Sequence, residues 1–287
     1  MSEVVILTDS VAQIPSDLAQ QYHIGVIPLS VIIEEKSYRD GVDILPAELY
    51  QRMRTEGILP RTSQPSVGEY LDFFRRHLEK DTQSVIYFSL TAKLSGAFST
   101  ALKAAHLLEE EYPEKKVVIF DTGTATIAQG LIAIHAARAV QKGANIERVI
   151  ELAQEECSKV GFVVMLETLT YLERGGRIGK AAYLVGNLMN VKPILTIDEE
   201  GLVAPIGNIR GEKKVVERLV DCMADRIGDK VPTQIAVMHA DETEKAEQLK
   251  KLAQERFNLE EIFITDFTPV MGAHAGPGVI GLAYQLE

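Results

Sequence analysis

Short turns that bear hydroxyl or carboxyl side chains recur in the amino-terminal half of the chain, and they constrain the fold more than any other feature. Three apolar runs have the pattern of buried parallel strands: Val4–Thr8, Ser84–Ser89 and Lys116–Phe120. The turns Asp9-Ser10, Ser95-Gly96 and Asp121-Thr122 come after these runs, and a helical pattern follows each turn. Strands that alternate with helices form a parallel sheet, so we expect the turns to gather at its carboxyl edge, where open α/β sheets bind ligands.

The alternation of strand and helix continues to about residue 160, and it predicts a three-layer α/β/α domain around a mostly parallel sheet. A second apolar run rich in β-branched residues covers Gly25–Ile33, and the polar stretch after it contains the turn Asp40-Gly41. The expected helices of this half are Pro15–Tyr22, Ile44–Thr55, Val67–Leu78, Gly96–Glu110, Ala125–Gln141 and Ile146–Val160.

The pattern changes in the second half, which predicts an α/β domain with a mixed sheet. Pro193–Ile197 and Leu202–Asn208 are apolar runs joined by a turn that contains Gly201, a pattern typical of a β-hairpin. We place the boundary between two domains, 1–160 and 161–287, near residue 160 and expect a large shared interface. The other expected strands are Phe162–Leu166, Gln234–Met238, Glu261–Thr265 and Val279–Tyr284, and the expected helices are Leu169–Arg174, Lys180–Met189, Glu212–Ile227 and Glu244–Phe257.

Length, charge and cysteine content narrow the class of protein. With 287 residues the chain is long for a single hydrophobic core and suits two domains. A formal net charge of −11 argues against nucleic acid as the main partner, because that binding depends on Lys and Arg at phosphates. The start has no basic segment before an apolar stretch, and no apolar run is long enough to cross a bilayer, so we expect a cytoplasmic protein without an integral membrane segment. Cys157 and Cys222 are expected to be free thiols.

Hydroxyl groups in two of the turns are candidates for binding an anion. A capping box is predicted at Ser66, but Thr62 and Ser63 have no such structural role and are free to meet a ligand. Ser95 is expected to cap a helix, and Gly96 beside it leaves the backbone open to a ligand. Hydroxyls and the backbone N–H groups of helix starts favour a carboxylate or a phosphate without a fixed positive charge. We therefore expect neutral donors to hold the anion.

Two motifs of the second half supply candidate charged groups. His274 stands in a run of small residues, 272–278, that is expected to be a glycine-rich loop lying against a ligand. Arg174 and Arg177 flank a pair of glycines, and the fork of an Arg side chain suits a carboxylate or a phosphate. Between Arg174 and Lys214 there are seven basic and four acidic residues, so this basic region either meets an anionic group or an acidic partner protein, or is a solvated face.

Metal ions and nucleotide cofactors are not expected. The sequence has no zinc-ligand spacing, no Walker A loop and no GxGxxG motif. Asp9 and Asp121 each stand at the end of a strand directly before Ser or Thr, where an Asx turn explains them more simply than a metal site does.

Two other classes of function are compatible with parts of the sequence. One is a hydrolase or acyltransferase acting on a lipid ester, with Ser95 as nucleophile, His274 as base and Asp121 as the orienting acid. A nucleophile elbow has a glycine two residues before the serine, whereas this chain has Lys93 there, which disfavours the enzyme. The other is a pure interaction protein recruited through the basic region that ends at Lys214.

Six segments spread over the whole chain form a distinctive set. They are Thr8-Asp9-Ser10, Thr62-Ser63-Gln64-Pro65-Ser66, Leu94-Ser95-Gly96, Leu172-Glu173-Arg174-Gly175-Gly176-Arg177-Ile178, Val191-Lys192-Pro193-Ile194-Leu195, and His274 with Gly276-Pro277-Gly278. Together they resemble the DegV family of bacterial fatty-acid-binding proteins. The resemblance implies two α/β domains with a long-chain fatty acid between them. It also implies that Thr62 and Ser95 hold the carboxyl group and that the tail lies in an apolar tunnel.

The same resemblance implies a partner and a reaction. Proteins of this family present the lipid to the catalytic subunit of a fatty acid kinase, which transfers the γ-phosphoryl group of ATP to the carboxyl group and forms an acyl phosphate for phospholipid metabolism. The chain is then a lipid-binding subunit without catalysis of its own. Residues that match Arg174, Arg210 and His274 are implied near the exposed carboxyl end, where they help to dock the kinase or balance charge during transfer.

Overall fold

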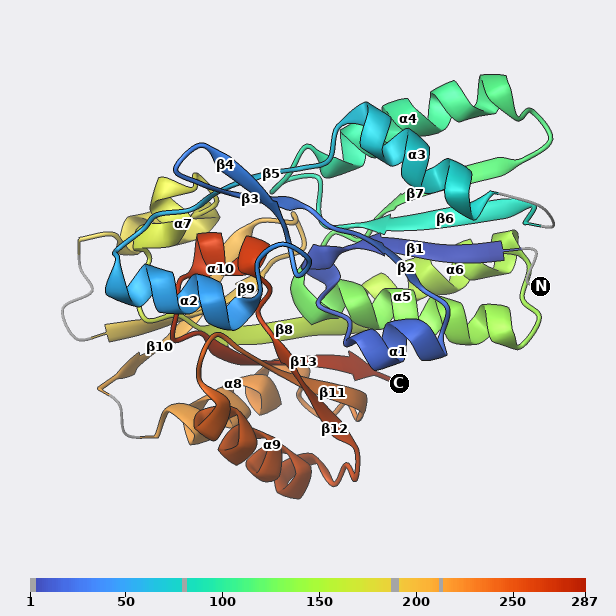
Figure 1. Ribbon diagram of the computed structural model, residues 1–287. Coiled ribbons are helices and arrows are strands. Elements are labelled where there is room, and N and C mark those ends of the chain that lie inside the picture. The colour runs from blue at the N-terminus through green and yellow to red at the C-terminus, as the bar shows by residue number, and fades with distance from the viewer. Residues whose placement is uncertain (1–3, 79–81, 187–190, 212–213) are drawn as a thin grey trace.

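The computed structural model of the chain describes residues 4–78, 82–186, 191–211 and 214–287, and within them it contains three β-sheets (Figure 1). The first sheet is formed by β1 (Val4–Asp9), β2 (Gly25–Ile27), β6 (Ser84–Ser89) and β7 (Lys116–Asp121). Its strand order is β2-β1-β6-β7, and all three strand pairs are parallel. The predicted parallel sheet is confirmed, and the turns after β1, β6 and β7 lie at its carboxyl edge.

Helices cover both faces of this sheet, which confirms the predicted three-layer arrangement (Figure 1). α3 (Val67–His77) and α4 (Ala97–Glu111) pack on one face. α1 (Ser16–Gln21), α5 (Thr126–Gln141) and α6 (Ile146–Cys157) pack on the other face. The two apolar faces of the sheet are thereby removed from water, as a parallel sheet requires.

The second sheet combines parallel and antiparallel pairs, as predicted. Its strands are β8 (Val160–Met165), β9 (Val191–Ile197), β10 (Val203–Arg210), β11 (Pro232–His239), β12 (Ile262–Asp266) and β13 (Ile280–Leu286). The strand order is β10-β9-β8-β13-β11-β12, in which β11 and β12 run parallel and β9 and β10 form the expected hairpin. One face of the sheet is covered by α8 (Val215–Ile227) and α9 (Thr243–Phe257).

α5 lies between the two sheets and packs against both. Eleven of its 16 residues are buried, and Arg138 is its one Lys, Arg, Asp or Glu residue. A helix that is apolar on nearly every side is typical of one covered from all sides. It contacts β1 and β6 of the first sheet and β8 and β13 of the second.

Every strand of the second sheet begins at or after Val160. The division of the chain into two domains at residue 160 stays a prediction.

A small antiparallel sheet was not anticipated from the sequence. It consists of β3 (Ser30–Ile33), β4 (Lys36–Arg39) and β5 (Arg61–Ser63) in the order β4-β3-β5. The run Gly25–Ile33, expected as one apolar segment, is divided between β2 and β3. Pro28 stands at the break, where its missing N–H cannot donate to a strand ladder.

The predicted helix Lys180–Met189 is wrong in its described part. The chain there forms a 3₁₀ helix, η2 (Gly179–Leu184), and residues 187–190 lie outside the described part of the chain. Gly186, with a φ of 85°, is not helical. The short helix before it is confirmed as α7 (Thr170–Arg174), and the helix expected over Ile44–Thr55 is α2 (Pro46–Thr55), which begins at a proline because this residue suits the first turn.

The glycine-rich loop expected around His274 is also wrong in its first part. Residues 269–275 form a helix, α10 (Pro269–Ala275), and His274 lies in its last turn. Glycine lowers helix propensity, so the local pattern favoured a loop. Gly272 is needed for packing, however, because a Cβ there would lie 2.5 Å from the ring of Tyr50 on α2. The loop begins only after α10, at Gly276 with a φ of 80°.

The two cysteines are free, as predicted, with Cys222 buried and Cys157 half-buried. Burial raises the pKa of the Cys157 thiol to about 11, so its reactive thiolate form is scarce at neutral pH. Among the helices in the described part of the chain, none has the length and apolar character that crossing a membrane requires.

Gly130→Ala should destabilise the protein, because it adds a methyl group where α5 meets the 3₁₀ turn after β1, Ser10–Ala12. The new Cβ would lie 2.4 Å from the carbonyl oxygen of Ala12 and 2.8 Å from Ile127 Cδ1. Overpacking of this kind costs about 1–3 kcal/mol of unfolding free energy, which urea unfolding would measure. Gly68→Ala on α3 is the matched control, since its Cβ has no neighbour closer than 3.9 Å. Equal stability of the two variants would contradict the packing assigned to α5.

Candidate ligand-binding site

A cavity lies where the carboxyl edge of the parallel sheet faces the second sheet. Val11 follows β1, Leu90 and Leu94 follow β6, and Ala125 and Thr126 follow β7, and all five residues line it. The cavity has a volume of about 110 Å³, several times the roughly 10–15 Å³ that one water molecule requires. It is therefore a space for an organic group, at the position where open α/β sheets bind ligands.

The opposite wall is the face of the second sheet that α8 and α9 leave uncovered. Phe162 and Val164 of β8 line the cavity, whereas Val163 between them packs beneath α8 and α9. Likewise Leu195 faces the cavity while Ile194 packs on the other side. Successive side chains of a strand point to opposite faces, so this wall follows directly from the register of β8 and β9. The cavity wall is apolar over most of its extent.

Asp9 anchors two parts of the wall. Its carboxylate is fully buried and accepts the N–H groups of Val11 (3.0 Å) and Leu90 (3.4 Å), both of which line the cavity. The hydroxyl of Tyr87 and the amide of Gln129 also donate to it. Burial raises the pKa of Asp9 to about 6. The bond to Val11 is the predicted Asx turn, and Asp121 makes its own with the N–H of Gly123 at 2.9 Å.

One end of the cavity is polar, and its groups come from segments far apart in the sequence. Thr62 on β5 and His274 on α10 are 212 residues apart, and Thr62 Oγ1 lies 2.8 Å from His274 Nε2. Ser95 lines the cavity beside them. The structure thus brings together three of the candidates singled out in the sequence: Thr62, Ser95 and His274.

Of the two arginines in the Arg-Gly-Gly-Arg motif, Arg177 is the one that belongs to this site. It lines the cavity, and its guanidinium donates to the carbonyl oxygens of Leu94 (3.0 Å) and Gly175 (2.6 Å). The sequence predicted that neutral donors hold the anion, whereas the structure also places the positive charge of Arg177 at the polar end. The signal in the sequence was the Arg-Gly-Gly-Arg motif, which did not tell Arg174 from Arg177.

The environment keeps His274 uncharged at neutral pH. Burial lowers the pKa of its imidazole, and the positive charge of Arg177 lowers it further, to about 4. Its Nδ1 is buried with no hydrogen-bond partner in the described part of the chain. The glycine at position 175 is required there, since a Cβ would lie 2.4 Å from His274 Nδ1. A neutral imidazole beside a guanidinium leaves the site with a net positive charge, which suits an anion.

The loop that carries Ser95 differs in detail from the prediction. The helix α4 has Gly96 at its N-cap position, and the hydroxyl of Ser95 accepts the N–H of Ala97 at 3.1 Å. Gln64 lies against Gly96, because a Cβ on this glycine would be 2.9 Å from Gln64 Nε2. Gln64 also lines the cavity, a position that no local pattern in the sequence indicated. Gly96 therefore gives room to a side chain of this protein.

Three other candidates lie outside the cavity lining. Ser63 is exposed, and its hydroxyl donates to the carbonyl of Gln64 at 3.1 Å. Arg174 is exposed at the end of α7, three residues before Arg177, and Arg210 is exposed at the end of β10. Arg174 and Arg210 are thus accessible to a partner. Arg174 is the nearer of the two in sequence to Arg177, which lines the cavity.

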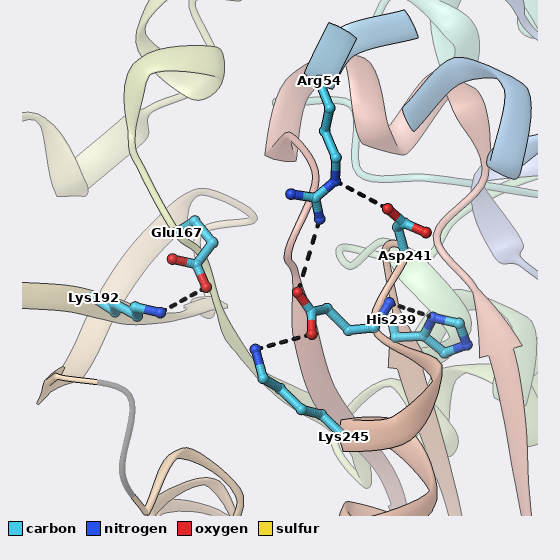
Figure 2. Close-up of polar contacts among 7 residues, drawn as sticks. Arg54, Glu167, Lys192, His239, Asp241 and Lys245 are labelled. Carbon is cyan, nitrogen blue, oxygen red and sulfur yellow. Dashed lines mark hydrogen bonds and ion pairs between the residues drawn. The ribbon is translucent and has the colours of Figure 1, made fainter. Parts of the chain in front are cut away.

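Much of the charge in the basic region is balanced by acidic neighbours. Lys192 Nζ lies 2.7 Å from Glu167 Oε1 (Figure 2). Lys180 Nζ lies 2.6 Å from Asp198 and 2.8 Å from Glu200. Lys213 lies outside the described residues. These pairings weaken the basic region as a docking surface.

The geometry does not assemble the catalytic groups of a hydrolase. His274 Nε2 is bonded to Thr62, and the Asp121 carboxylate receives the N–H groups of Ala92 and Gly123. Ser95 Oγ accepts from the backbone of Ala97.

No group of three or more metal-binding side chains occurs among residues 4–78, 82–186, 191–211 and 214–287.

In comparison with known proteins, nearly the whole chain matches the model of one family. Residues 3–287 match the family model described as "Uncharacterised protein, DegV family". A DegV domain-containing protein of Halalkalibacterium halodurans is 32% identical over 287 residues, which is all of both chains. A fatty-acid-binding DegV family protein from Thermus thermophilus has a TM-score of 0.90 at 29% identity and covers all of both chains. DegV of Bacillus subtilis, described as a fatty acid binding protein, has a TM-score of 0.88 at 30% identity with the same coverage.

Removing the charge of Arg177 should raise the pKa of His274. In Arg177→Met the repulsion disappears while burial remains, so the value should rise from about 4 toward 6.5 without reaching it. An NMR titration of the imidazole ring would measure this change, with His274→Gln to assign the signal. Arg148→Met, which alters an exposed arginine on α6, is the control. An unchanged His274 titration in Arg177→Met would show that the two groups do not interact.

Proposed function

The chain belongs to the DegV family, and we propose on this basis that it binds a long-chain fatty acid in the cavity between its two large sheets. The observation that carries the proposal is the distribution of polarity in the cavity. Most of the residues that line it are apolar. The hydroxyl of Thr62, the imidazole of His274 and the guanidinium of Arg177 lie together at one end. A molecule with one acidic end and a long apolar remainder matches this distribution.

The acyl chain supplies most of the binding free energy. Each buried methylene group contributes about 0.8 kcal/mol, so an acyl chain of about 16 carbons provides on the order of 10 kcal/mol before the entropic costs of binding. Side chains such as Phe162, Val164 and Leu195 would surround it. The polar end then has to orient the carboxyl group and does not have to supply the affinity.

The carboxyl group would lie beside Thr62, Ser95 and Arg177. The hydroxyls donate hydrogen bonds, and the guanidinium balances the negative charge. Neutral His274 adds no second positive charge. A carboxylate that faces one cation and hydroxyl donors keeps more of its nucleophilic character than one held between several cations.

We also propose the finer step that the family resemblance implies. A partner kinase transfers the γ-phosphoryl group of ATP to a carboxylate oxygen of the bound fatty acid, which forms an acyl phosphate and releases ADP. Arg174 is exposed close in sequence to Arg177, at a position from which it can contact the kinase. Arg210 is exposed on the end of β10 and is a second candidate for docking.

Fatty acid binding can be tested on the purified protein. Native mass spectrometry should detect a co-purified fatty acid, and palmitate or oleate should raise the melting temperature of the delipidated protein. Thr62→Val should weaken binding roughly tenfold, since a hydrogen bond to a charged group contributes about 1.5 kcal/mol. Thr55→Val, at an exposed position on α2, is the control. Absence of both the co-purified lipid and the thermal shift would refute the proposal.

The kinase step has its own test. Arg174→Ala should retain fatty acid but yield less acyl phosphate when the protein is mixed with a fatty acid kinase catalytic subunit and ATP, because Arg174 lies outside the cavity. The acyl phosphate can be trapped as a hydroxamate. Arg148→Ala, on the exposed side of α6, should behave as the unchanged protein. Lipid loss in Arg174→Ala would show that this side chain binds the ligand.

A further inference from the structure

α10 is a wall of the ligand cavity, and its amino-terminal end is capped by a residue from the other half of the chain. Thr268 occupies the N-cap position, but its hydroxyl donates to the carbonyl of Ser10 and makes no cap bond. Pro269 follows and has no N–H. The next N–H, on Val270, donates to Asp40 Oδ1 at 3.0 Å across 230 residues of sequence. Asp40 therefore does the work that a local N-cap side chain usually does.

Asp40 is buried and hydrogen-bonded in the loop before α2. It is 2% exposed, its N–H donates to the carbonyl of Leu29 at 2.8 Å, and it forms an isolated bridge with Ile44. Burial raises the pKa of its carboxyl group to about 6. The carboxylate thus predominates at neutral pH, and a bond from an N–H group to a carboxylate is stronger than one to a neutral acceptor.

Further contacts hold α10 against the amino-terminal half of the chain. The hydroxyl of Tyr50 on α2 donates to the carbonyl of Phe267 at 2.7 Å, and its ring packs on Gly272. α2 is in turn tied to the loop after β11, because Arg54 Nε lies 2.9 Å from Asp241 Oδ2 (Figure 2). At the other end of α10, His274 meets Thr62. The helix is thereby held at its start by Asp40, along its length by Tyr50 and at its end by Thr62.

The position of α10 determines the shape of the cavity. Val270, Met271 and His274, all on this short helix, line it. A helix of seven residues has few internal hydrogen bonds, so its position depends on its contacts with the rest of the protein. A shift at its start therefore moves the imidazole at its end.

We propose that Asp40 is a positioning residue for the ligand site: by capping α10 from the opposite half of the chain, it sets where His274 and Met271 lie in the cavity. Asp40 does not line the cavity itself. Its effect on affinity rests on the proposed function, whereas its effect on His274 does not.

The test compares Asp40→Ala with Asp40→Asn in two measurements. The ring signals of His274 in the ligand-free protein, followed by NMR and assigned with His274→Gln, should move in Asp40→Ala. Affinity for palmitate should fall about tenfold, because part of the binding free energy is then needed to return α10 to its position. Asp40→Asn keeps an oxygen that can accept the Val270 N–H, so it should restore the His274 signals and most of the affinity.

Glu156→Ala is the matched control, because Glu156 is another buried carboxylate that joins the two halves. It is 3% exposed on α6, and its Oε2 accepts from Gln285 of β13 at 2.5 Å, away from α10. This variant should lower the melting temperature and leave the His274 signals and the palmitate affinity unchanged. A loss of stability alone is therefore distinguished from a displacement of α10.

Two outcomes would overturn the proposal. Asp40→Ala with unchanged His274 signals would show that the cap does not position α10, and an Asp40→Asn variant as defective as Asp40→Ala would show that the accepting oxygen is not the cause. If Asp40→Ala does not fold, Asp40→Leu fills the same space without an acceptor and is judged by the same criteria. If the unchanged protein binds no palmitate, the proposed function fails, while the His274 signals still test the position of α10.

Discussion

The packing of α5 between two sheets is the constraint on which the ligand cavity depends. A helix with its side chains is roughly 10–12 Å across, and α5 contacts β1 and β6 on one side and β8 and β13 on the other. Where the helix begins, Ala125 and Thr126 line the cavity. α5 holds the two sheets apart along its length. Beyond its first residue the sheets are still apart, and the space between them is the cavity, enclosed mainly by apolar side chains.

The polar end of the cavity is assembled from four segments that pack on this framework, one of which is the loop before α4 with Ser95. β5 contributes Thr62, the segment after α7 contributes Arg177, and α10 contributes His274. Burial decides the charge of the group they form, because it keeps the imidazole neutral beside the guanidinium. A single cation among hydroxyl donors can orient an acid whose affinity comes mainly from its apolar part. The same burial makes the site sensitive to the position of α10, since His274 has little space in which to move.

Much of the fold could be predicted because it depends on local patterns. The strands β1, β6 and β7, the Asx turns at Asp9 and Asp121 and the capping box at Ser66 all follow from burial periodicity or from bonds within three residues. α10 could not be predicted, because Asp40 caps it from 230 residues away and Tyr50 compensates for its glycine. Arg177 could not be told from Arg174, because the packing of the segment after α7 decides which side chain enters the cavity.

By itself, the sequence determined most strands and helices of the two large sheets, and that hydroxyl-bearing turns would follow β1, β6 and β7 at the carboxyl edge of a parallel sheet. These features follow from hydrogen bonds and burial within a few neighbouring residues. Only the tertiary structure decided that Thr62 would meet His274, that Arg177 would bond to Leu94 and that Asp40 would cap α10. Each of these contacts joins residues at least 83 positions apart, and their approach depends on how the sheets pack around α5, which no local pattern of residues specifies.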